Sequence, residues 1–437
     1  MGKMPSIRRR FVFMNQNWKF ETRAVQAGYE PGNGDPRIVP IVQSTTYKYD
    51  DAQSVADLFD LKVPGYFYTR LANPTVDAFE KKIAALEGGV AAVAVSAGQT
   101  ANALSIMNIC TCGGHVLASG GLYGGTTAFF TNTLKKMGIT VTFVPSEATA
   151  EEILSAARPE TRAVFTETLA NPALVVADFE EFSKAAKALG VPLIVDNTFP
   201  SPFLCNPFDY GADIVTHSST KYIDGHATSV GGIIVEKGSF DWRNGKFPEF
   251  TEPDESYHGL VYTENFAQSP YSVKLRVQWI RDFGVPMMPF NAFLANLGAE
   301  TLHVRMPRHC ENALALAEYL ERHPKVGWVN YPFLKSNSQY AKAKRYLRGG
   351  SGVLCFGVKG GKAAGEKVMN SLKLASIVVH VADIRTCVLH PASMTHRQLT
   401  EEELKAAGVS PDLIRVSVGL ENIDDIIADF EQALAQV

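Results

Sequence analysis

The chain has 437 residues, of which 46% are hydrophobic and 20% are charged, a composition typical of globular proteins. Its formal net charge of −3 at pH 7 excludes the strongly basic surface that binds nucleic acid or an anionic membrane. No apolar run approaches the roughly 18 residues of a membrane-spanning helix. A prior of about 150 residues per domain predicts two or three domains.

The six cysteines are scattered and lack the paired spacing of a zinc site, so we expect no bound metal. They stand at positions 110, 112, 205, 310, 355 and 387. Cys110 and Cys112 are predicted to be two small buried residues at a helix end. The expected compartment is the reducing cytoplasm.

Residues 1–65 are predicted to form a tail and an extended arm. The start, MGKMPSIRRRFVFMNQ, is basic, and its apolar stretch at 11–14 is far too short for the core of a signal peptide. We assign no function to residues 1–13. Residues 15–65 are turn-rich and contain no long periodic helix, so we expect this segment to lie on a partner rather than fold alone.

The first long helix is predicted to begin at Asn73-Pro74-Thr75, because proline is tolerated in a first helical turn. Four apolar residues follow at helical spacing: Val76, Phe79, Ile83 and Leu86. The glycines at 88 and 89 then end the helix. We predict that residues 66–290 form the large domain.

Short apolar strands alternate with helices through most of this region. Strands are predicted at 90–95, 116–119, 141–144, 163–166, 192–195 and 212–215, and helices at 100–110, 126–137, 151–157 and 179–189. Such alternation is typical of right-handed βαβ units. We therefore predict an α/β fold with a mostly parallel sheet flanked by helices.

The pattern changes in the last third of the chain. Residues 238–264 are polar and aromatic and are predicted to be a long surface insertion. A long helical pattern at 290–320 leads to predicted strands at 353–358 and 376–380 and to an amphipathic helix at 423–435. We predict that residues 291–437 form a smaller α+β domain.

Asp196 and Lys221 follow two neighbouring predicted strands. Asp196 ends the strand at 192–195, and Lys221 stands in a hydroxyl-rich loop after the strand at 212–215. Ligands of open α/β sheets bind beyond the carboxyl ends of the strands. A carboxylate and a lysine at such positions suit pyridoxal phosphate, whose ring nitrogen takes an Asp and whose aldehyde takes a Lys. The alternative is an ordinary buried aspartate beside a solvent-facing lysine.

The first predicted strand runs into a turn that contains Gly98 and Gln99 and then into a helix. Small residues there let backbone N–H groups approach an anion at the helix N-terminus. Ser218 and Thr220 could complete this phosphate site, and the planar guanidinium of Arg70 could grip phosphate oxygens. The alternative is a tight turn without a ligand.

Seven motifs occur in the order seen in the family of pyridoxal-phosphate enzymes of Cys/Met metabolism. They are SAGQT, LYGGT, TETLANP, VDNTF, HSSTKYIDGH, HPASMTHRQL and IRVSVGLENIDDII. The chain resembles this family over nearly all of residues 18–437. The resemblance implies a pyridoxal-phosphate-dependent transferase of fold type I, with active sites shared between the subunits of a dimer and two dimers in a tetramer.

The resemblance also implies roles for single residues. Lys221 would bond to the cofactor aldehyde and then carry protons, while Asp196 would keep the ring nitrogen protonated. Tyr123 would stack on the ring, Asn171 would lie near its hydroxyl group, and Arg415 would bind the substrate carboxylate. The phosphate ligands would be Gly98, Gln99, Ser218 and Thr220, joined by Tyr68 and Arg70 of the neighbouring subunit. Alternatively, Asn171 starts a turn and Arg415 pairs with a structural acid.

Within the family, the chain is most similar to the branch that converts O-acetylhomoserine and sulfide, or a small thiol, to homocysteine, or methionine, and acetate. Gly125 stands where methionine γ-lyases usually carry a cysteine, which favours this branch. One alternative is a γ-lyase that acts on methionine, cystathionine or homocysteine. The other is a non-catalytic protein on the same fold.

Three residues near the implied carboxylate site depart from common family patterns. Where members tend to have Ser or Asn and then Gly, this chain has His380 and Ala382. We predict that His380 lies in the substrate pocket, where it would narrow the pocket or hydrogen-bond the substrate. The alternative is a packed core histidine. Arg385 stands where lyases often have Glu, which is consistent with a transferase.

Overall fold

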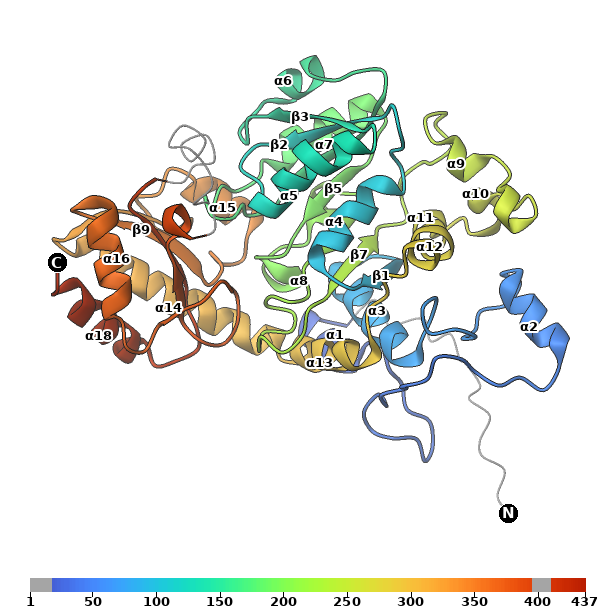
Figure 1. Ribbon diagram of the computed structural model, residues 1–437, viewed down its shortest axis with the longest axis horizontal. Helices are drawn as coiled ribbons and strands as arrows, with labels where there is room; N and C mark the ends of the chain where they lie inside the picture. Colours follow the sequence, from blue (N-terminus) through green and yellow to red (C-terminus); the bar gives the residue numbers. More distant parts are fainter. Residues whose placement is uncertain (1–17, 395–409) are drawn as a thin grey trace.

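The computed structural model of the protein describes residues 18–394 and 410–437. The predicted tail at 1–13 and the end of the HPASMTHRQL motif lie outside the described residues. Figure 1 shows a large unit around a central sheet and, beside it, a smaller unit around a second sheet. This arrangement confirms the predicted α/β class, and the boundary at residues 290 and 291 stays a prediction.

The central sheet has seven strands in the order β1-β7-β6-β5-β4-β2-β3. Their bounds are β1 Ala91–Val95, β2 His115–Ser119, β3 Thr140–Val144, β4 Thr161–Glu167, β5 Leu193–Asp196, β6 Ile214–His217 and β7 Gly232–Glu236. β2 to β6 pair in parallel, while β7 is antiparallel to both β1 and β6. The predicted mostly parallel sheet is confirmed. The sequence prediction did not include β7, which follows β6 without a helix between them.

The α-helices described in this part of the chain are α1 Phe20–Gln26, α2 Ala52–Phe59, α3 Pro74–Glu87, α4 Gly98–Met107, α5 Gly124–Ala128, α6 Ala150–Ser155, α7 Phe179–Leu189, α8 Ser201–Leu204, α9 Pro248–Thr251, α10 Tyr262–Asn265, α11 Pro270–Lys274 and α12 Arg281–Phe283. Helices such as α4 and α7 flank the central sheet, whereas α2 lies on a projecting arm (Figure 1). The helix predicted at 126–137 begins earlier, at Gly124, and continues as a π-helical segment, Phe129–Leu134.

α3 shows how local sequence sets the ends of a helix. The Asn73 side chain accepts a hydrogen bond from the Thr75 N–H at 2.9 Å, and Pro74 occupies the first helical position. Gly88 ends the helix with φ at +82°, a left-handed conformation that glycine adopts without steric cost. Between these ends, Phe79 and Ile83 are fully buried, and the helix packs against β1.

The second sheet has five strands in the order β10-β11-β12-β9-β8. Their bounds are β8 Val326–Asn330, β9 Val353–Val358, β10 Ser376–Ile377, β11 Cys387–Leu389 and β12 Leu413–Ser417. The accompanying helices are α13 Pro289–Glu300, α14 Leu302–Arg322, α15 Tyr340–Tyr346, α16 Gly361–Ser371 and α18 Ile423–Leu434. α14 and α18 pack together beside this sheet around a second hydrophobic cluster.

Three expectations for this half of the chain need correction. The helical pattern at 290–320 is two helices, because the backbone breaks at Thr301, with φ −105° and ψ 6°. The strand predicted at 376–380 ends at Ile377; beyond it the backbone turns, and the His380 carbonyl accepts a hydrogen bond from Arg415. The predicted surface insertion is anchored by buried aromatic rings, since Trp242 stacks on Tyr271 with ring centroids 5.5 Å apart.

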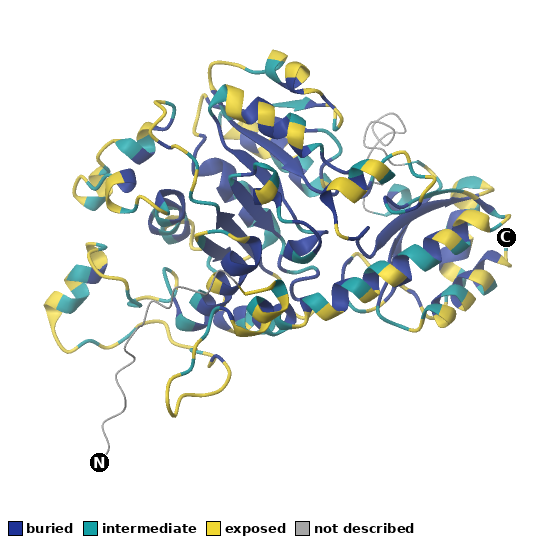
Figure 2. Ribbon diagram, turned by 180° about the vertical axis from the view of Figure 1, so that it is seen from behind, coloured by how far each residue is buried: buried dark blue, intermediate teal, exposed yellow. Residues whose placement is uncertain are grey.

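The N-terminal arm projects from the large unit (Figure 1). It contains α2 and long stretches without regular structure, and Figure 2 shows that much of its surface is exposed. Its exposed large apolar side chains are Ile38, Ile41, Phe59, Val63 and Tyr68. An arm with so much apolar surface in water is typical of a contact with another chain.

Within the described residues, no helix has the length and apolar character needed to cross a membrane. The same part of the chain holds no cluster of three or more His, Cys, Asp or Glu that could bind a metal ion. All six cysteines carry free thiols. Cys110 is buried as predicted, but Cys112 is exposed, because it lies in the turn between α4 and β2.

The core of the central sheet offers a test of the packing. Phe165 of β4 is fully buried and meets Phe130 edge to face, with ring centroids 5.1 Å apart. Phe165→Ala should lower the free energy of unfolding by about 3–5 kcal/mol, because it removes buried apolar surface and leaves a cavity. Denaturant unfolding measures this loss. Phe165→Leu should cost less, and an unchanged midpoint for Phe165→Ala would contradict the packing.

Candidate active site

The candidate site lies at the carboxyl ends of three adjacent parallel strands. Glu167 at the end of β4 is the register partner of Asp196 at the end of β5, and Asp196 is the partner of Thr216 in β6. Paired residues of adjacent strands project to the same face of a sheet. Lys221 follows four residues after β6 ends. The strand register therefore brings the predicted Asp and Lys to one edge.

Asp196 is buried, and both of its carboxylate oxygens accept hydrogen bonds. Asn102 Nδ2 donates to Asp196 Oδ2 at 2.8 Å. Thr198 donates twice to Oδ1, from its hydroxyl at 2.5 Å and from its backbone N–H at 3.1 Å. These donors fix the orientation of the carboxylate. Sequence reasoning missed Asn102 and Thr198, although Thr198 lies within the VDNTF motif.

Glu167 is a second buried acid that sequence reasoning missed, although it belongs to the TETLANP motif. Its Oε2 accepts a hydrogen bond from the Tyr123 N–H at 2.8 Å. Burial, together with the negative charge of Asp196, raises the pKa of Glu167 well above its ordinary value. Both effects favour the neutral form of Glu167, which would hold the Tyr123 backbone without a second full charge beside Asp196.

Lys221 is placed so that its amine can lose its proton near neutral pH. Burial and the positive charge of Arg415 lower the pKa of Lys221 from 10.5 to about 8. Its Nζ lies 3.4 Å from Nδ1 of His380. A lysine of lowered pKa can act as a nucleophile toward an aldehyde and as a base.

Arg415 reaches the site from β12 of the second sheet. Its guanidinium donates to Asn171 Oδ1 and to the His380 carbonyl, each at 3.1 Å. None of the ion pairs formed among the described residues includes Arg415. A buried guanidinium without an acid is suited to bind a carboxylate ligand. Asn171 therefore contacts Arg415 in this structure, and its position near the ring hydroxyl of the cofactor stays a prediction.

The predicted phosphate site is assembled by close backbone packing. A Cβ added to Gly98 would lie 2.4 Å from Ser218 Cβ, so the turn that opens α4 touches the loop after β6. Ser218 N–H donates to the Thr198 hydroxyl at 2.9 Å, which ties this loop to the loop after β5. The hydroxyl of Thr220 donates to the Gly231 carbonyl at 3.1 Å, so binding a phosphate oxygen would require that bond to be exchanged.

The side chain of Gln99 points to a missing ligand. Its Nε2 is buried and has no hydrogen-bond partner among the described residues. An unsatisfied buried donor is costly, on the order of 1–3 kcal/mol. A phosphate oxygen bound at the N-terminus of α4 would satisfy it.

The Tyr123 ring lies next to Gln99. A Cβ added to Gly125 would lie 2.6 Å from Cε1 of the Tyr123 ring and 3.3 Å from Gln99 Oε1. The ring therefore occupies the space that a side chain at 125 would fill, next to Gln99. Tyr123 itself is half-exposed, which leaves ring surface available for stacking on a ligand.

Tyr68 and Arg70 lie apart from these groups, on the projecting arm. The Arg70 guanidinium stacks over the Tyr68 ring at 5.0 Å, and both residues are exposed. In the described chain, neither side chain forms a hydrogen bond with Gly98, Ser218 or Lys221. Of the predicted site residues, these two are therefore not brought to the site of their own chain.

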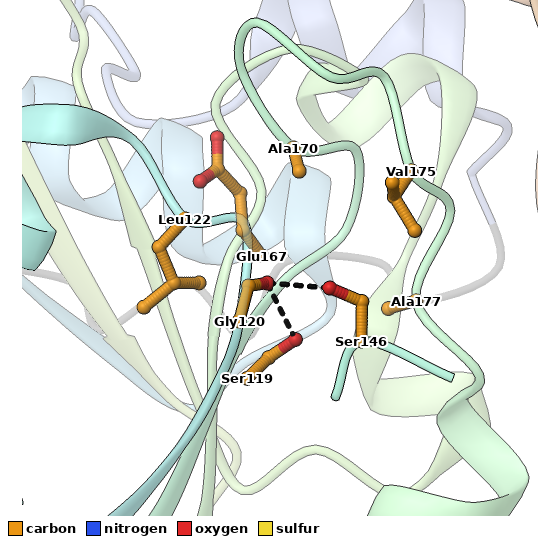
Figure 3. A pocket seen from close by; sticks show the side chains of 8 residues that line it. All are labelled: Ser119, Gly120, Leu122, Ser146, Glu167, Ala170, Val175 and Ala177. Carbon is orange, nitrogen blue, oxygen red and sulfur yellow. Dashed lines mark hydrogen bonds between the residues drawn. The ribbon is translucent and has the colours of Figure 1, made fainter. Parts of the chain in front are cut away.

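A small pocket lies behind Glu167 (Figure 3). Its hydroxyl groups are already used, because Ser146 and Ser119 both donate to the Gly120 carbonyl, at 2.6 and 3.1 Å. Figure 3 shows that the Glu167 carboxyl group points away from this pair. The pocket is therefore a recess behind the site rather than the place of reaction.

Together these groups fit pyridoxal phosphate. The chain offers an amine for the aldehyde at Lys221, a hydrogen-bonded carboxylate for the ring nitrogen at Asp196 and an unsatisfied donor for the phosphate at Gln99. Lys221 lies in the loop after β6, Asp196 ends β5, and Gln99 stands in the first turn of α4, all at the same edge of the sheet. This arrangement agrees with the general binding position of open α/β sheets.

Gly98→Ala should weaken binding of pyridoxal phosphate by roughly tenfold or more, a loss of at least about 1.4 kcal/mol in binding free energy. The reason is that the added methyl group would displace Ser218, a predicted phosphate ligand. Dialysis followed by the absorbance of the retained cofactor measures the affinity. Gly327→Ala is the matched control, because its added Cβ would meet no atom closer than 3.6 Å. Equal cofactor affinity in the two variants would contradict the proposed phosphate position.

Comparison with known proteins agrees with this site. The family model described as Cys/Met metabolism PLP-dependent enzyme matches residues 21–435. The O-acetyl-L-homoserine sulfhydrylase of Leptospira meyeri is 48% identical, with 97% of this chain and 98% of that protein covered. The homocysteine synthase of Schizosaccharomyces pombe is 49% identical, with 95% and 98% covered.

A solved structure confirms the fold. A putative O-acetylhomoserine (thiol)-lyase from Campylobacter jejuni, which carries a pyridoxyl-lysine monophosphate, superposes with a TM-score of 0.93 at 35% identity, covering 96% of this chain and 100% of that one. The predicted fold type and the predicted cofactor are thereby confirmed. The chain belongs to the family of pyridoxal-phosphate-dependent enzymes of Cys/Met metabolism.

Proposed function

We propose that the protein replaces the acetyl group of O-acetylhomoserine with sulfide or a small thiol, which yields homocysteine or methionine and acetate. One observation carries this assignment: the Lys221 amine and the Arg415 guanidinium both contact His380. Lys221 contacts the ring nitrogen Nδ1, and Arg415 contacts the backbone carbonyl oxygen. A base and a carboxylate-binding group thus lie side by side, as an amino-acid substrate requires. The similarity to O-acetylhomoserine sulfhydrylases, near half identity over almost the full chain, supports the choice of substrate.

Each residue has a role in the proposed reaction. When bound, pyridoxal phosphate supplies an electron sink for charge that develops on the substrate carbons. Asp196 holds the proton of the ring nitrogen, and Tyr123 covers the ring. Lys221 removes the proton from the α-carbon and then one from the β-carbon, so that acetate leaves from the γ-carbon. Sulfide adds at the same carbon, and Lys221 returns the protons.

The remaining residues bind and orient. Arg415 binds the α-carboxylate of the substrate, and Asn171 holds the guanidinium from the other side. Gln99, Ser218 and Thr220 bind the phosphate group together with the backbone at Gly98. His380 lines the substrate pocket between Lys221 and Arg415.

We further propose that two chains share each active site and that two such dimers form a tetramer in the cytoplasm. Tyr68 and Arg70 would reach the phosphate of the partner from the projecting arm. The exposed apolar residues of the arm support a contact with a second chain, and a phosphate dianion bound only by hydroxyl and amide groups lacks a cation that Arg70 could supply. The six free thiols suit a reducing compartment.

A steady-state assay tests the reaction. With sulfide, O-acetylhomoserine should give homocysteine and acetate, and Lys221→Ala should abolish turnover, because it removes the proposed base. The same assay with O-succinylhomoserine, and with cysteine in place of sulfide, measures the ester and thiol preference. Release of 2-oxobutanoate without sulfide, faster than homocysteine formation with it, would instead favour a γ-lyase.

Co-expression of two inactive variants tests the shared site. Arg70→Ala and Lys221→Ala should each have little activity alone. In a mixed dimer, one of the two sites carries both changes and the other carries neither, so random pairing should restore about a quarter of the wild-type activity per chain. Activity that stays at the level of the separate variants would show that Arg70 serves its own chain.

A further inference from the structure

His380 stands where members of the family tend to have Ser or Asn, so the resemblance assigns no role to a histidine here. It stands on the segment between β10 and β11 and is partly buried. Its Nδ1 lies 3.4 Å from Lys221 Nζ, and its backbone carbonyl is held by Arg415 at 3.1 Å. The imidazole therefore lies directly beside the amine that the proposed reaction uses.

The segment that carries His380 is held in place at several points. The Ala382 N–H donates to Ser417 Oγ of β12 at 2.7 Å, although Ala382 has a φ of +71° that favours glycine. Asp383 Oδ1 accepts from the Arg385 N–H at 2.7 Å. The other carboxylate oxygen, Oδ2, lies 3.6 Å from His380 Nε2.

These contacts decide which nitrogen of the ring carries the proton. Burial and the charge of Lys221 lower the pKa of His380, so the ring is neutral and one nitrogen is an acceptor. Nε2 lies 3.6 Å from the Asp383 carboxylate, beyond hydrogen-bond distance, and forms no hydrogen bond among the described residues. The negative charge of Asp383 favours the hydrogen on this nitrogen. Nδ1 is then left with a lone pair directed at Lys221 Nζ, which can donate.

We propose that His380 is a positioning residue for Lys221: its Nδ1 accepts a hydrogen bond from the Lys221 amine, and Asp383 fixes the tautomer and orientation of the imidazole. This inference rests on the proposed role of Lys221 as the base. Once the substrate has displaced the lysine from the cofactor, the amine is free to rotate. His380 holds the amine near the substrate carbons. Asp383, the imidazole and Lys221 thus form a row of three neighbouring side chains.

Other titratable groups face the same space and must stay unchanged in the test. Arg415 of β12, Cys387 of β11, and Asp224 after β6 contribute to the electrostatics of Lys221 or His380. For this reason the variants change only residue 380. Asn places a polar atom where Nδ1 lies, Gln places one where Nε2 lies, and Leu keeps most of the volume without either.

The first measurement uses the full chain stripped of cofactor with hydroxylamine. The rate at which pyridoxal phosphate is recaptured, followed by absorbance, should rise with pH around a midpoint near the Lys221 pKa of about 8. His380→Leu removes an acceptor that stabilises the protonated amine, so the midpoint should fall by roughly half a unit to one unit. His380→Asn should restore the midpoint, and His380→Gln should not.

The second measurement uses the cofactor-loaded protein and norvaline, which has no leaving group at the γ-carbon. Exchange of its α-hydrogen in D₂O, followed by proton NMR, reports removal of the α-proton by Lys221 without the later steps of the reaction. His380→Leu should slow exchange roughly 10- to 100-fold with little change in the norvaline concentration for half saturation. His380→Asn should recover most of the rate.

Unchanged midpoint and unchanged exchange in His380→Leu would overturn the inference. Equal rescue by Asn and Gln would also overturn it, because the contact would then not be made through Nδ1. These outcomes are separate from failure of the proposed function, in which norvaline exchange persists but O-acetylhomoserine and sulfide yield no homocysteine. Thermal unfolding of each variant separates a loss of fold from a loss of positioning.

Discussion

The pairing of the parallel strands β4, β5 and β6 is the constraint on which the site depends. Their register places Glu167 beside Asp196 and brings the loop with Lys221 next to both. A shift of one residue in β5 would turn Asp196 to the opposite face of the sheet. The buried apolar residues of these strands, such as Val195 and Val215, therefore position the chemistry as well as stabilise the core.

Two ionisable side chains of the site lack an oppositely charged partner among the described residues when no ligand is bound. Asp196 is held by hydrogen bonds from Asn102 and Thr198, and neither it nor Arg415 forms an ion pair within residues 18–394 and 410–437. Burial and the nearby Asp196 raise the pKa of Glu167, which favours its neutral form beside Asp196. A cationic ring nitrogen and an anionic substrate carboxylate would complete both charges, so the unbound protein is arranged for its ligands at some cost in stability.

The short segment between β10 and β11 connects site residues of the two halves of the chain. Arg415 and His380 belong to the C-terminal half of the chain, whereas Asp196 and Lys221 belong to the central sheet. The contacts of His380 with both Lys221 and Arg415 join the two halves at the point of reaction. Displacement of either half would therefore alter the base and the carboxylate-binding group together.

The sequence by itself determined the α/β class and most strands of the central sheet, and it singled out Asp196, Lys221, Gly98 and Arg415 as predicted site residues. Apolar runs and turn residues are local signals, and the ordered motifs add the resemblance to a known family. The antiparallel β7 and the break at Thr301 escaped prediction, because each depends on what the backbone packs against.

Only the tertiary structure decided the partners of these residues. Asn102, Glu167 and Thr198 had no distinctive spacing that could assign them to Asp196 or to Tyr123. The contact between His380 and Lys221 joins residues 159 positions apart, and the lowered pKa of Lys221 follows from burial and from Arg415. Burial and distance between remote segments arise from packing, which a linear pattern does not specify.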